Sequence, residues 1–134
     1  MTTQLDKVLF LDIDGVLNTY ETKERFRGTY GIDQSLLEIF RLITPTPIVL
    51  SSTWRLYPKH RAEVMRHIEI HDCTPLLNTP RHKEISAWLD KNQPKDFVIL
   101  DDDLDANIEG HFFHVPNGLT HELVHAINER LRNA

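Results

Sequence analysis

The chain alternates short apolar runs with longer segments in which apolar residues recur every three or four positions. A continuous apolar run bounded by polar residues is typical of a strand that is buried on both faces. This pattern predicts strands at Lys7–Asp12, Ile48–Ser52, Phe97–Leu100 and His111–Val115. A further short strand is expected near Ile68–His71.

The periodic segments predict helices. Asp33 and Thr120 are residue types that cap helix N-termini, and Thr79-Pro80 combines an N-cap with a proline at the first helical position. Asn18–Ile32 is polar, contains two glycines and is expected to form a loop or small flap. Helices are expected over Gln34–Ile43, over Lys59–Ile68, from Pro80 to about Lys91 and from Thr120 to about Leu131.

Strands that alternate with helices predict an α/β fold with a parallel sheet covered by helices on both faces. We expect a single Rossmann-like domain over residues 1–134 with little or no cap. In such sheets, ligands bind at the carboxyl ends of the strands. Three predicted strands end there in reactive side chains, namely Asp12 and Asp14, Ser51 to Thr53, and Asp101 to Asp103.

Charge limits the classes of partner. Fifteen Lys and Arg against twenty Asp and Glu give a net charge of −5, which excludes nucleic-acid binding through bulk positive charge. A local basic cluster remains the one place where the chain can hold a polyanion. Its members are Arg55, Lys59, His60, Arg61 and Arg66.

The sequence contains no recognisable signal peptide or membrane-spanning segment. No apolar run approaches the ~20 residues that span a membrane, and the start MTTQLDK lacks the basic and apolar regions of a signal peptide. The single Cys73 cannot form an internal disulfide. We therefore expect a cytoplasmic protein without a membrane partner, and the sequence indicates no protein partner or oligomer.

The polar groups at the predicted sheet edge suggest phosphoryl chemistry. Gathered carboxylates repel one another unless a cation neutralises them, and hard oxygen ligands select Mg²⁺. One Asp can attack phosphorus, and a second, two residues later, can move the proton of the leaving group. A hydroxyl holds the phosphoryl oxygens, and a nearby Arg or Lys offsets their charge.

At this point the sequence resembles a known family. DIDGVL, at Asp12 to Leu17, looks like the first motif of the haloacid dehalogenase (HAD)-type phosphatases. IVLSST is similar to their second motif, the basic residues in TPRHKEISAWL to their third, and FVILDDD to their fourth. All four occur in the family's order, between about Lys7 and Asp105.

The resemblance implies roles for individual residues. Asp12 would be the nucleophile and a metal ligand, and Asp14 the general acid/base with its backbone carbonyl on the metal. Asp101 and Asp102 would complete the Mg²⁺ site, for which Asp105 is a further candidate, whereas Asp103 is expected to face solvent.

Ser51 or Ser52 would bind phosphate, with Ser52 preferred because Trp54 matches the T-x-W pattern of small members. Thr53 and Arg55 are further substrate-binding candidates, and Arg81 or Lys83, with Arg81 preferred, would be the third-motif cation.

The short segments available for a cap suggest a capless member with an exposed site. An open site favours a large phosphorylated substrate, and some small members with this motif style are attached to nucleic-acid repair enzymes. A nucleotide or a terminal phosphate of a nucleic acid is therefore the expected substrate. Trp54 and Arg55 can stack on and grip such a substrate, or can be core and structural residues.

Two alternative functions compete with this one. His121-Glu122-Leu123-Val124-His125 matches the H-E-x-x-H pattern of zinc hydrolases. On a helix, however, His121 and His125 fall outside the apolar stripe and are expected to face solvent. The second alternative is a catalytically silent domain of the same fold that binds phosphate or a partner.

Overall fold

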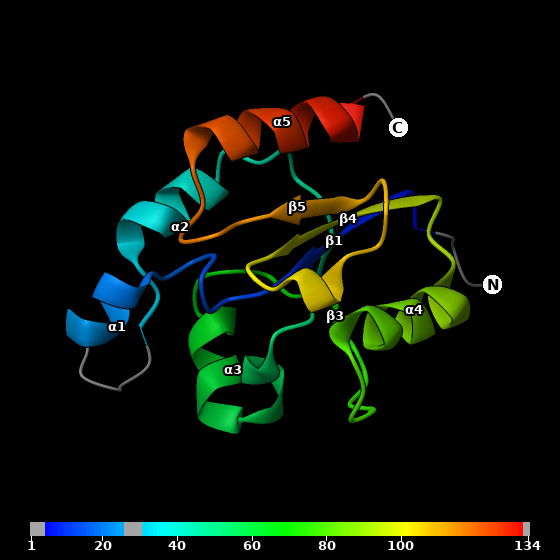
Figure 1. The fold of residues 1–134 in the computed structure, drawn as a ribbon, viewed down its shortest axis with the longest axis horizontal. Coiled ribbons are helices and arrows are strands. Elements are labelled where there is room, and N and C mark those ends of the chain that lie inside the picture. Colours follow the sequence, from blue (N-terminus) through cyan, green and yellow to red (C-terminus); the bar gives the residue numbers. More distant parts are fainter. Residues whose placement is uncertain (1–4, 26–30, 133–134) are drawn as a thin grey trace.

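The computed structural model describes residues 5–25 and 31–132. Parts of the polar N-terminus and of the expected flap therefore lie outside the described residues. The centre of the molecule is a five-stranded sheet in the order β3-β2-β1-β4-β5, in which all neighbouring strands run parallel (Figure 1). The strands are β1 (Lys7–Leu11), β2 (Ile48–Leu50), β3 (Asp72–Cys73), β4 (Asp96–Asp101) and β5 (Phe112–His114).

The strand order places a topological switch beside β1. The chain moves outward from β1 to β2 and β3, and then crosses back to form β4 on the other side of β1. A crevice forms where the order reverses, outside the carboxyl ends of the strands. The ends of β1 and β4, at Leu11 and Asp101, therefore lie side by side at this crevice.

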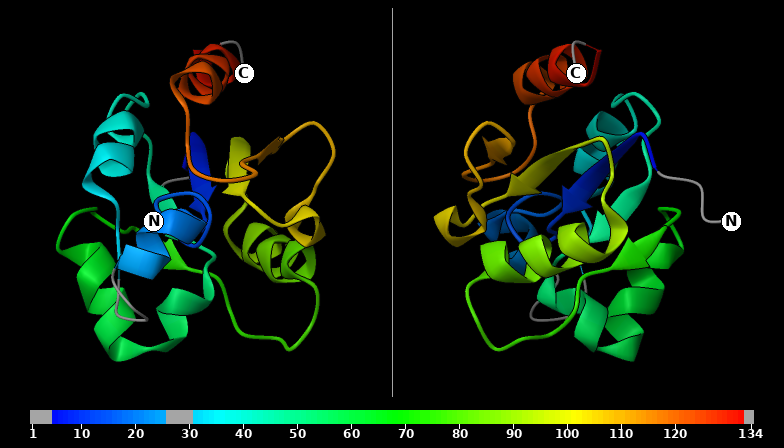
Figure 2. Two further views of the ribbon diagram at one scale, coloured as in Figure 1. Left: turned by 60° about the vertical axis from the view of Figure 1, so that its left-hand side comes forward. Right: turned by 90° about the vertical axis from the view of Figure 1, so that its right-hand side faces the viewer.

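Helices cover both faces of the sheet. Along β1, alternate residues point to opposite faces, so Leu9 and Leu11 join the larger core with Leu37, whereas Val8 and Phe10 join the smaller one. Figure 2 shows α2 (Gln34–Phe40) and α3 (Pro58–Met65) on one side and α4 (Arg81–Asn92) on the other. The larger core also contains buried residues of α5 (His121–Arg132).

The smaller core anchors α4. Ile85 and Trp88 are its buried apolar residues, and the ring of Trp88 packs edge-on against Phe10 with centroids 5.4 Å apart. This packing holds α4 against the sheet, with its first turn beginning at Arg81. The expected α/β fold with a parallel sheet and helices on both faces is confirmed.

Two elements differ from the expectations of the sequence. A helix, α1 (Tyr20–Arg25), forms inside the segment that was expected to be a loop. The strand β3 begins at Asp72, one residue beyond the segment in which a strand was expected. Both were hard to predict because neither contains a continuous apolar run or a helical apolar stripe.

The start of α4 also differs. Thr79 does not cap the helix, because Pro80 occupies the N-cap position and makes no side-chain capping bond. Instead, the carboxylate of Asp105 accepts a hydrogen bond from the backbone N–H of Arg81, with an N···O distance of 3.3 Å. Asp33 and Thr120 cap their helices as expected. Within the described part of the chain, no helix has the length and apolar character to cross a membrane.

Candidate active site

Three polar residues lie at the carboxyl ends of neighbouring strands, at the same level of the sheet. Leu11 pairs in register with Leu50 of β2 and Leu100 of β4, so the next residues, Asp12, Ser51 and Asp101, form a row at the carboxyl edge. The backbone N–H of Asp12 donates to the carbonyl of Leu100 at 3.0 Å, and that of Ser51 donates to the carbonyl of Leu11 at 3.1 Å. The parallel sheet thus brings together side chains that are 39 and 89 positions after Asp12 in the sequence.

Carboxylates concentrate at the end of this row. Oxygen atoms of Asp12, Asp101 and Asp102 all lie within 4.8 Å of one another. Asp12 is 3% exposed and Asp101 is fully buried, whereas Asp102 is exposed. Three carboxylates at this spacing provide the hard oxygen donors that Mg²⁺ prefers, and the donor set therefore fits that ion.

Arg81 neutralises part of this charge. Its Nη1 lies 3.2 Å from Oδ1 of Asp12 and 2.8 Å from Oδ2 of Asp101. Burial by itself lowers the pKa of Arg81, but the charges of the two carboxylates outweigh this effect and raise it. The guanidinium therefore stays protonated between the two acids.

One cation does not offset all the negative charge. Burial and then the neighbouring charge of Asp101 raise the pKa of Asp12 from 3.8 to about 9. Burial also raises the pKa of Asp101, against the opposing effect of Arg81. Without further positive charge, the site favours a protonated carboxyl, and this preference indicates a place for a cation.

Asp14 lies just beyond the carboxylate cluster and is not one of its three members. Its Oδ1 accepts a hydrogen bond from Nδ2 of Asn18 at 3.1 Å, and Oδ1 of Asn18 accepts one from the N–H of Gly15 at 2.9 Å. Asn18 is 1% exposed and also donates to the carbonyl of Gly31. Asn18 therefore holds both Asp14 and the turn after it, a role that the sequence analysis missed.

Gly15 lets the chain turn beside the cluster. Its φ of +83° is a conformation that other residues adopt with strain. A Cβ atom at this position would lie 2.3 Å from Oδ2 of Asp102, closer than any van der Waals contact. The glycine thus provides the space in which Asp102 approaches the turn.

The comparison with known proteins agrees with this geometry. Residues 8–124 match the family described as the HAD domain in Swiss Army Knife RNA repair proteins. The chain belongs to this HAD family. No curated protein matches the chain closely enough to count as a relative. The expected membership of the HAD-like hydrolases is thereby confirmed.

The two serines of this HAD domain differ in their bonding. Oγ of Ser52 accepts a hydrogen bond from the N–H of Trp54 at 3.2 Å and so caps the 3₁₀ turn η1 (Thr53–Leu56). Ser51 is fully buried, and its Oγ has no hydrogen-bond partner among the described residues. Ser51 therefore carries a buried hydroxyl without a partner in the part of the protein that the structure describes, whereas the Ser52 hydroxyl already accepts one bond and keeps its proton to donate. Thr53 is exposed and lines a neighbouring cavity.

Arg55 and Trp54 do not face solvent as a substrate-gripping pair would. Arg55 is 5% exposed, and its five N–H groups donate to four backbone carbonyls and to Glu84. A guanidinium has five donors, so none remains for a phosphate. Trp54 is 6% exposed and belongs to the larger core. This arrangement corrects the expectation that Arg55 binds substrate.

The other candidates occupy different positions. Lys83 is exposed on α4, and no ion pair of this residue is found in the described structure, whereas Arg81 points at the carboxylates. Asp103 is exposed and caps the turn η2 (Leu104–Ala106), as expected for a solvent-facing residue. Asp105 bonds the first turn of α4 and is outside the group of three carboxylates.

The zinc-hydrolase alternative finds no support in the geometry. His121, Glu122 and His125 are all exposed on α5. Among residues 5–25 and 31–132, the one group of three or more side chains spaced to hold a metal is Asp12, Asp101 and Asp102. The two histidines and the glutamate of the HELVH pattern therefore lie on a solvated helix face, while Val124 belongs to the core.

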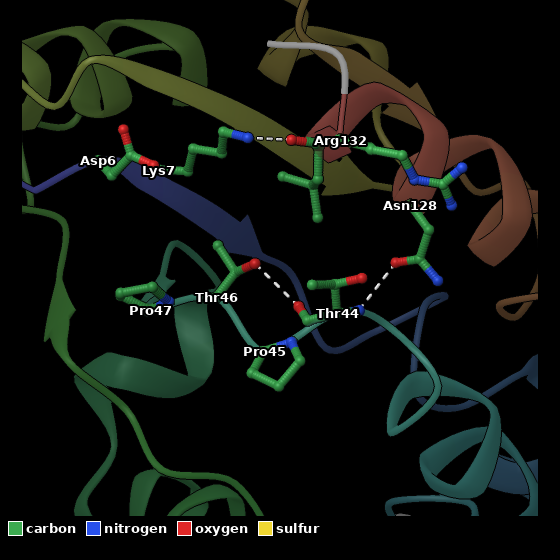
Figure 3. Close-up of a pocket in the computed structure, with 9 residues that line it drawn as sticks. Asp6, Lys7, Thr44, Pro45, Thr46, Pro47, Asn128 and Arg132 are labelled. Carbon is green, nitrogen blue, oxygen red and sulfur yellow. Dashed lines mark hydrogen bonds between the residues drawn. The ribbon is translucent and has the colours of Figure 1, made fainter.

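Cavities lie at both ends of the sheet. A cavity of about 560 Å³ is lined by Arg81 and Asp105 and lies next to the carboxylates. Another, of about 420 Å³, lies at the amino ends of β1 and β2 (Figure 3). Its polar groups bond one another, as Thr44 does with Asn128 and Lys7 with the carbonyl of Leu131. The first cavity is the one that adjoins reactive groups.

Proposed function

We propose that this HAD domain is a Mg²⁺-dependent phosphomonoester hydrolase that acts through an aspartyl-phosphate on Asp12. The observation that carries the proposal is the cluster of Asp12, Asp101 and Asp102 with Arg81 at the carboxyl edge of the sheet. Membership of the HAD family supports the same class of reaction.

In the first step, an Oδ atom of Asp12 attacks the phosphorus, and the bond between phosphorus and the leaving oxygen breaks. Asp14 donates a proton to that leaving oxygen. In the second step, the carboxylate of Asp14 takes a proton from water, whose oxygen attacks the phosphorus of the aspartyl-phosphate. Inorganic phosphate leaves, and the carboxylate of Asp12 is restored.

The remaining groups bind the metal and the phosphate. Asp12, Asp101 and Asp102, with the backbone carbonyl of Asp14, would hold Mg²⁺. When bound, the ion supplies the positive charge that favours ionised carboxylates in a site where burial opposes them. Arg81 and the buried hydroxyl of Ser51 are suited to hold the transferring phosphoryl oxygens.

We further propose that the substrate is a terminal phosphate of RNA. Membership of the family described as the HAD domain in Swiss Army Knife RNA repair proteins supports this substrate class. The segment after Ser52 also offers exposed side chains to a large ligand, because Tyr57 is 57% exposed and follows η1 directly. Bases stack on such aromatic side chains, and the exposed Lys59 and Arg61 can contact phosphates.

The test compares four substrates: RNA oligonucleotides with a 5′- or a 3′-phosphate, a nucleotide and a sugar phosphate. After chelation, Mg²⁺ should restore hydrolysis and Zn²⁺ should not. At least one RNA end should be hydrolysed with a higher kcat/KM than the sugar phosphate. Tyr57→Ala should reduce kcat/KM for that RNA, with little effect on the sugar phosphate. If the sugar phosphate is the best substrate, RNA as the substrate class is wrong.

Variants of the two aspartates test the chemistry. Asp12→Asn should abolish hydrolysis, and activity within tenfold of the wild type would overturn the nucleophile. Asp14→Asn should slow turnover by roughly 10²–10⁴-fold. The loss should be smaller for nitrophenyl phosphate, whose leaving group needs no proton. Equal losses for good and poor leaving groups would contradict the acid role of Asp14.

A further inference from the structure

Arg55 and Glu84 form an ion pair that is almost completely enclosed. Their side chains are 3% and 8% exposed, and Nη2 of Arg55 lies 3.2 Å from Oε1 of Glu84. The other N–H groups of Arg55 all donate to backbone carbonyls. These bonds run to Ser51 (3.1 Å), Ser52 (2.9 Å), Thr74 (2.9 Å) and Pro75 (3.1 Å).

The partners of Arg55 come from three separate segments. Ser51 and Ser52 follow β2, Thr74 and Pro75 follow β3, and Glu84 lies in the first turn of α4. The second oxygen of Glu84 accepts a hydrogen bond from the N–H of Leu77 at 2.9 Å, within the loop that leads to α4. One ion pair therefore joins the loop after β2, the loop after β3 and the start of α4.

The ion pair adjoins the groups that the proposed reaction needs. Residues three apart on a helix are neighbours on its surface, so Glu84 lies beside Arg81 on α4. Arg81 reaches Asp12 and Asp101, while the carbonyl of Ser51 is held by Arg55 itself. The pair thus bridges the backbone of Ser51 to the helical turn that carries Arg81.

We propose that Arg55 and Glu84 are positioning residues that set the location of Ser51 and Arg81 relative to Asp12. This inference rests on the proposed function, because it assigns a purpose to the pair in phosphoryl transfer. The pair itself touches no reacting atom. Its loss would let the loop after β2 and the first turn of α4 shift independently, and a displacement of about 1 Å can reduce turnover about 10²-fold.

Removal of Arg55 or Glu84 alone would mainly reduce the stability of the fold and would say little about positioning. Removal of one partner leaves the other as an unpaired buried charge, which destabilises a protein strongly. Replacement of both partners by apolar residues of similar size leaves no unpaired buried charge. It still removes the donors to the four backbone carbonyls and the acceptor of Leu77, so the stability of the variant has to be measured as well. The informative variant is therefore the double substitution Arg55→Met with Glu84→Met, in the whole chain.

A second ion pair provides the control. Asp96 and Arg130 join the amino end of β4 to α5, with Nη2 of Arg130 3.0 Å from Oδ1 of Asp96. Asp96 and Asp101, the latter a member of the carboxylate cluster, are at opposite ends of the same strand. Asp96→Met with Arg130→Met removes an ion pair that is less buried, with side chains 16% and 26% exposed, and that lies at the other end of β4 from the site.

The experiment measures turnover, metal affinity and inhibitor affinity in the folded variants. For Arg55→Met with Glu84→Met, kcat should fall by at least tenfold, while the Kd for Mg²⁺ stays within about twofold of the wild type. Orthovanadate, which mimics five-coordinate phosphorus, should lose more affinity than inorganic phosphate. The control pair should change none of these quantities by more than about twofold.

Conservative substitutions separate positioning from charge. Arg55→Lys keeps the charge but cannot make five directed hydrogen bonds, so it should not restore kcat. Glu84→Gln keeps the acceptor for Leu77 and should be intermediate. The inference is wrong if the double Met variant keeps the wild-type kcat, if vanadate and phosphate lose affinity equally, or if Arg55→Lys is fully active. An inactive wild type would instead overturn the proposed function.

Discussion

The substitution Gly15→Ala should weaken Mg²⁺ binding without a loss of stability beyond the strain of the backbone itself. The new Cβ would lie 2.3 Å from Oδ2, 2.6 Å from Cγ and 2.7 Å from Cβ of Asp102. Ordinary contacts between such atoms begin near 3.4 Å, so Asp102 has to move by about 1 Å. Asp102 is exposed and can turn toward solvent, but in doing so it leaves the carboxylate cluster.

The cost of the backbone conformation can be measured separately. Gly110 has a φ of +86°, close to the +83° of Gly15, and a Cβ there would meet no atom within 4 Å. Gly110→Ala therefore carries the strain of a positive φ alone, about 1–2 kcal/mol. Both variants should lose a similar amount of stability in the absence of metal, since the side chain of Asp102 is exposed and can turn away from the new methyl group.

The assay combines urea unfolding in a chelator with a calorimetric titration of Mg²⁺. Gly110→Ala should bind Mg²⁺ as the wild type does, whereas Gly15→Ala should bind it at least tenfold more weakly and lose activity in proportion. Equal Mg²⁺ affinity in the two variants would refute the reasoning. If Gly15→Ala were much less stable than Gly110→Ala, the side chain of Asp102 would be unable to move aside.

Three further predictions concern charge. Asp12→Asn should raise the Tm of the metal-free protein above pH 4 because the folded pKa is about 9 against an ordinary 3.8. Between pH 3.8 and about 9, the free energy of unfolding of the wild type decreases by at most about 1.4 kcal/mol per pH unit, because the folded state binds the proton that the unfolded state has lost. Melting curves at pH 4 and 8 would contradict this reasoning if the gain did not grow with pH. Hydrogen bonds from Arg130 lower the pKa of Asp96. Asp96→Asn should therefore cost up to about 1 kcal/mol at pH 7 in urea unfolding, and nothing below the lowered pKa, where the wild-type carboxyl is also neutral. His121→Ala and His125→Ala should each change the free energy of unfolding by less than about 0.5 kcal/mol. Metal analysis of the purified wild type should find no stoichiometric zinc; zinc that is present in the wild type and lost in either variant would contradict this.

The carboxylate cluster could be predicted from the sequence because parallel strands align their carboxyl ends. Three apolar runs that each end in polar residues were enough to place Asp12 near Asp101 without knowledge of any contact. The same reasoning placed Ser51 and Ser52 at that edge but could not distinguish them. Their difference depends on which hydroxyl the turn after β2 engages.

Arg55 shows where a local pattern is insufficient. An Arg next to a Trp and before a basic helix resembles a polyanion-binding surface. Its actual partner, Glu84, is 29 residues away and lies on a helix that reaches it only through the fold. A buried cation is identified by its distant acceptors, and the linear sequence does not show which carbonyls a turn leaves available.

The two halves of the site are held by different interactions, so their defects should be separable. Asp12 and Asp101 are fixed by the backbone ladder between β1 and β4, which needs no side chain. The ion pair between Arg55 and Glu84 is a separate tether, which joins the carbonyl of Ser51 to the first turn of α4, where Arg81 lies. Gly15→Ala should therefore reduce Mg²⁺ affinity with intact positioning of Arg81, and the double Met variant should reduce turnover with intact Mg²⁺ affinity. At saturating Mg²⁺, additive effects of the two variants on kcat would show that the halves act independently, although Asp102 and Arg81 both lie beside Asp12 and Asp101. Strong non-additivity would mean that Asp102 and Arg81 move as one unit.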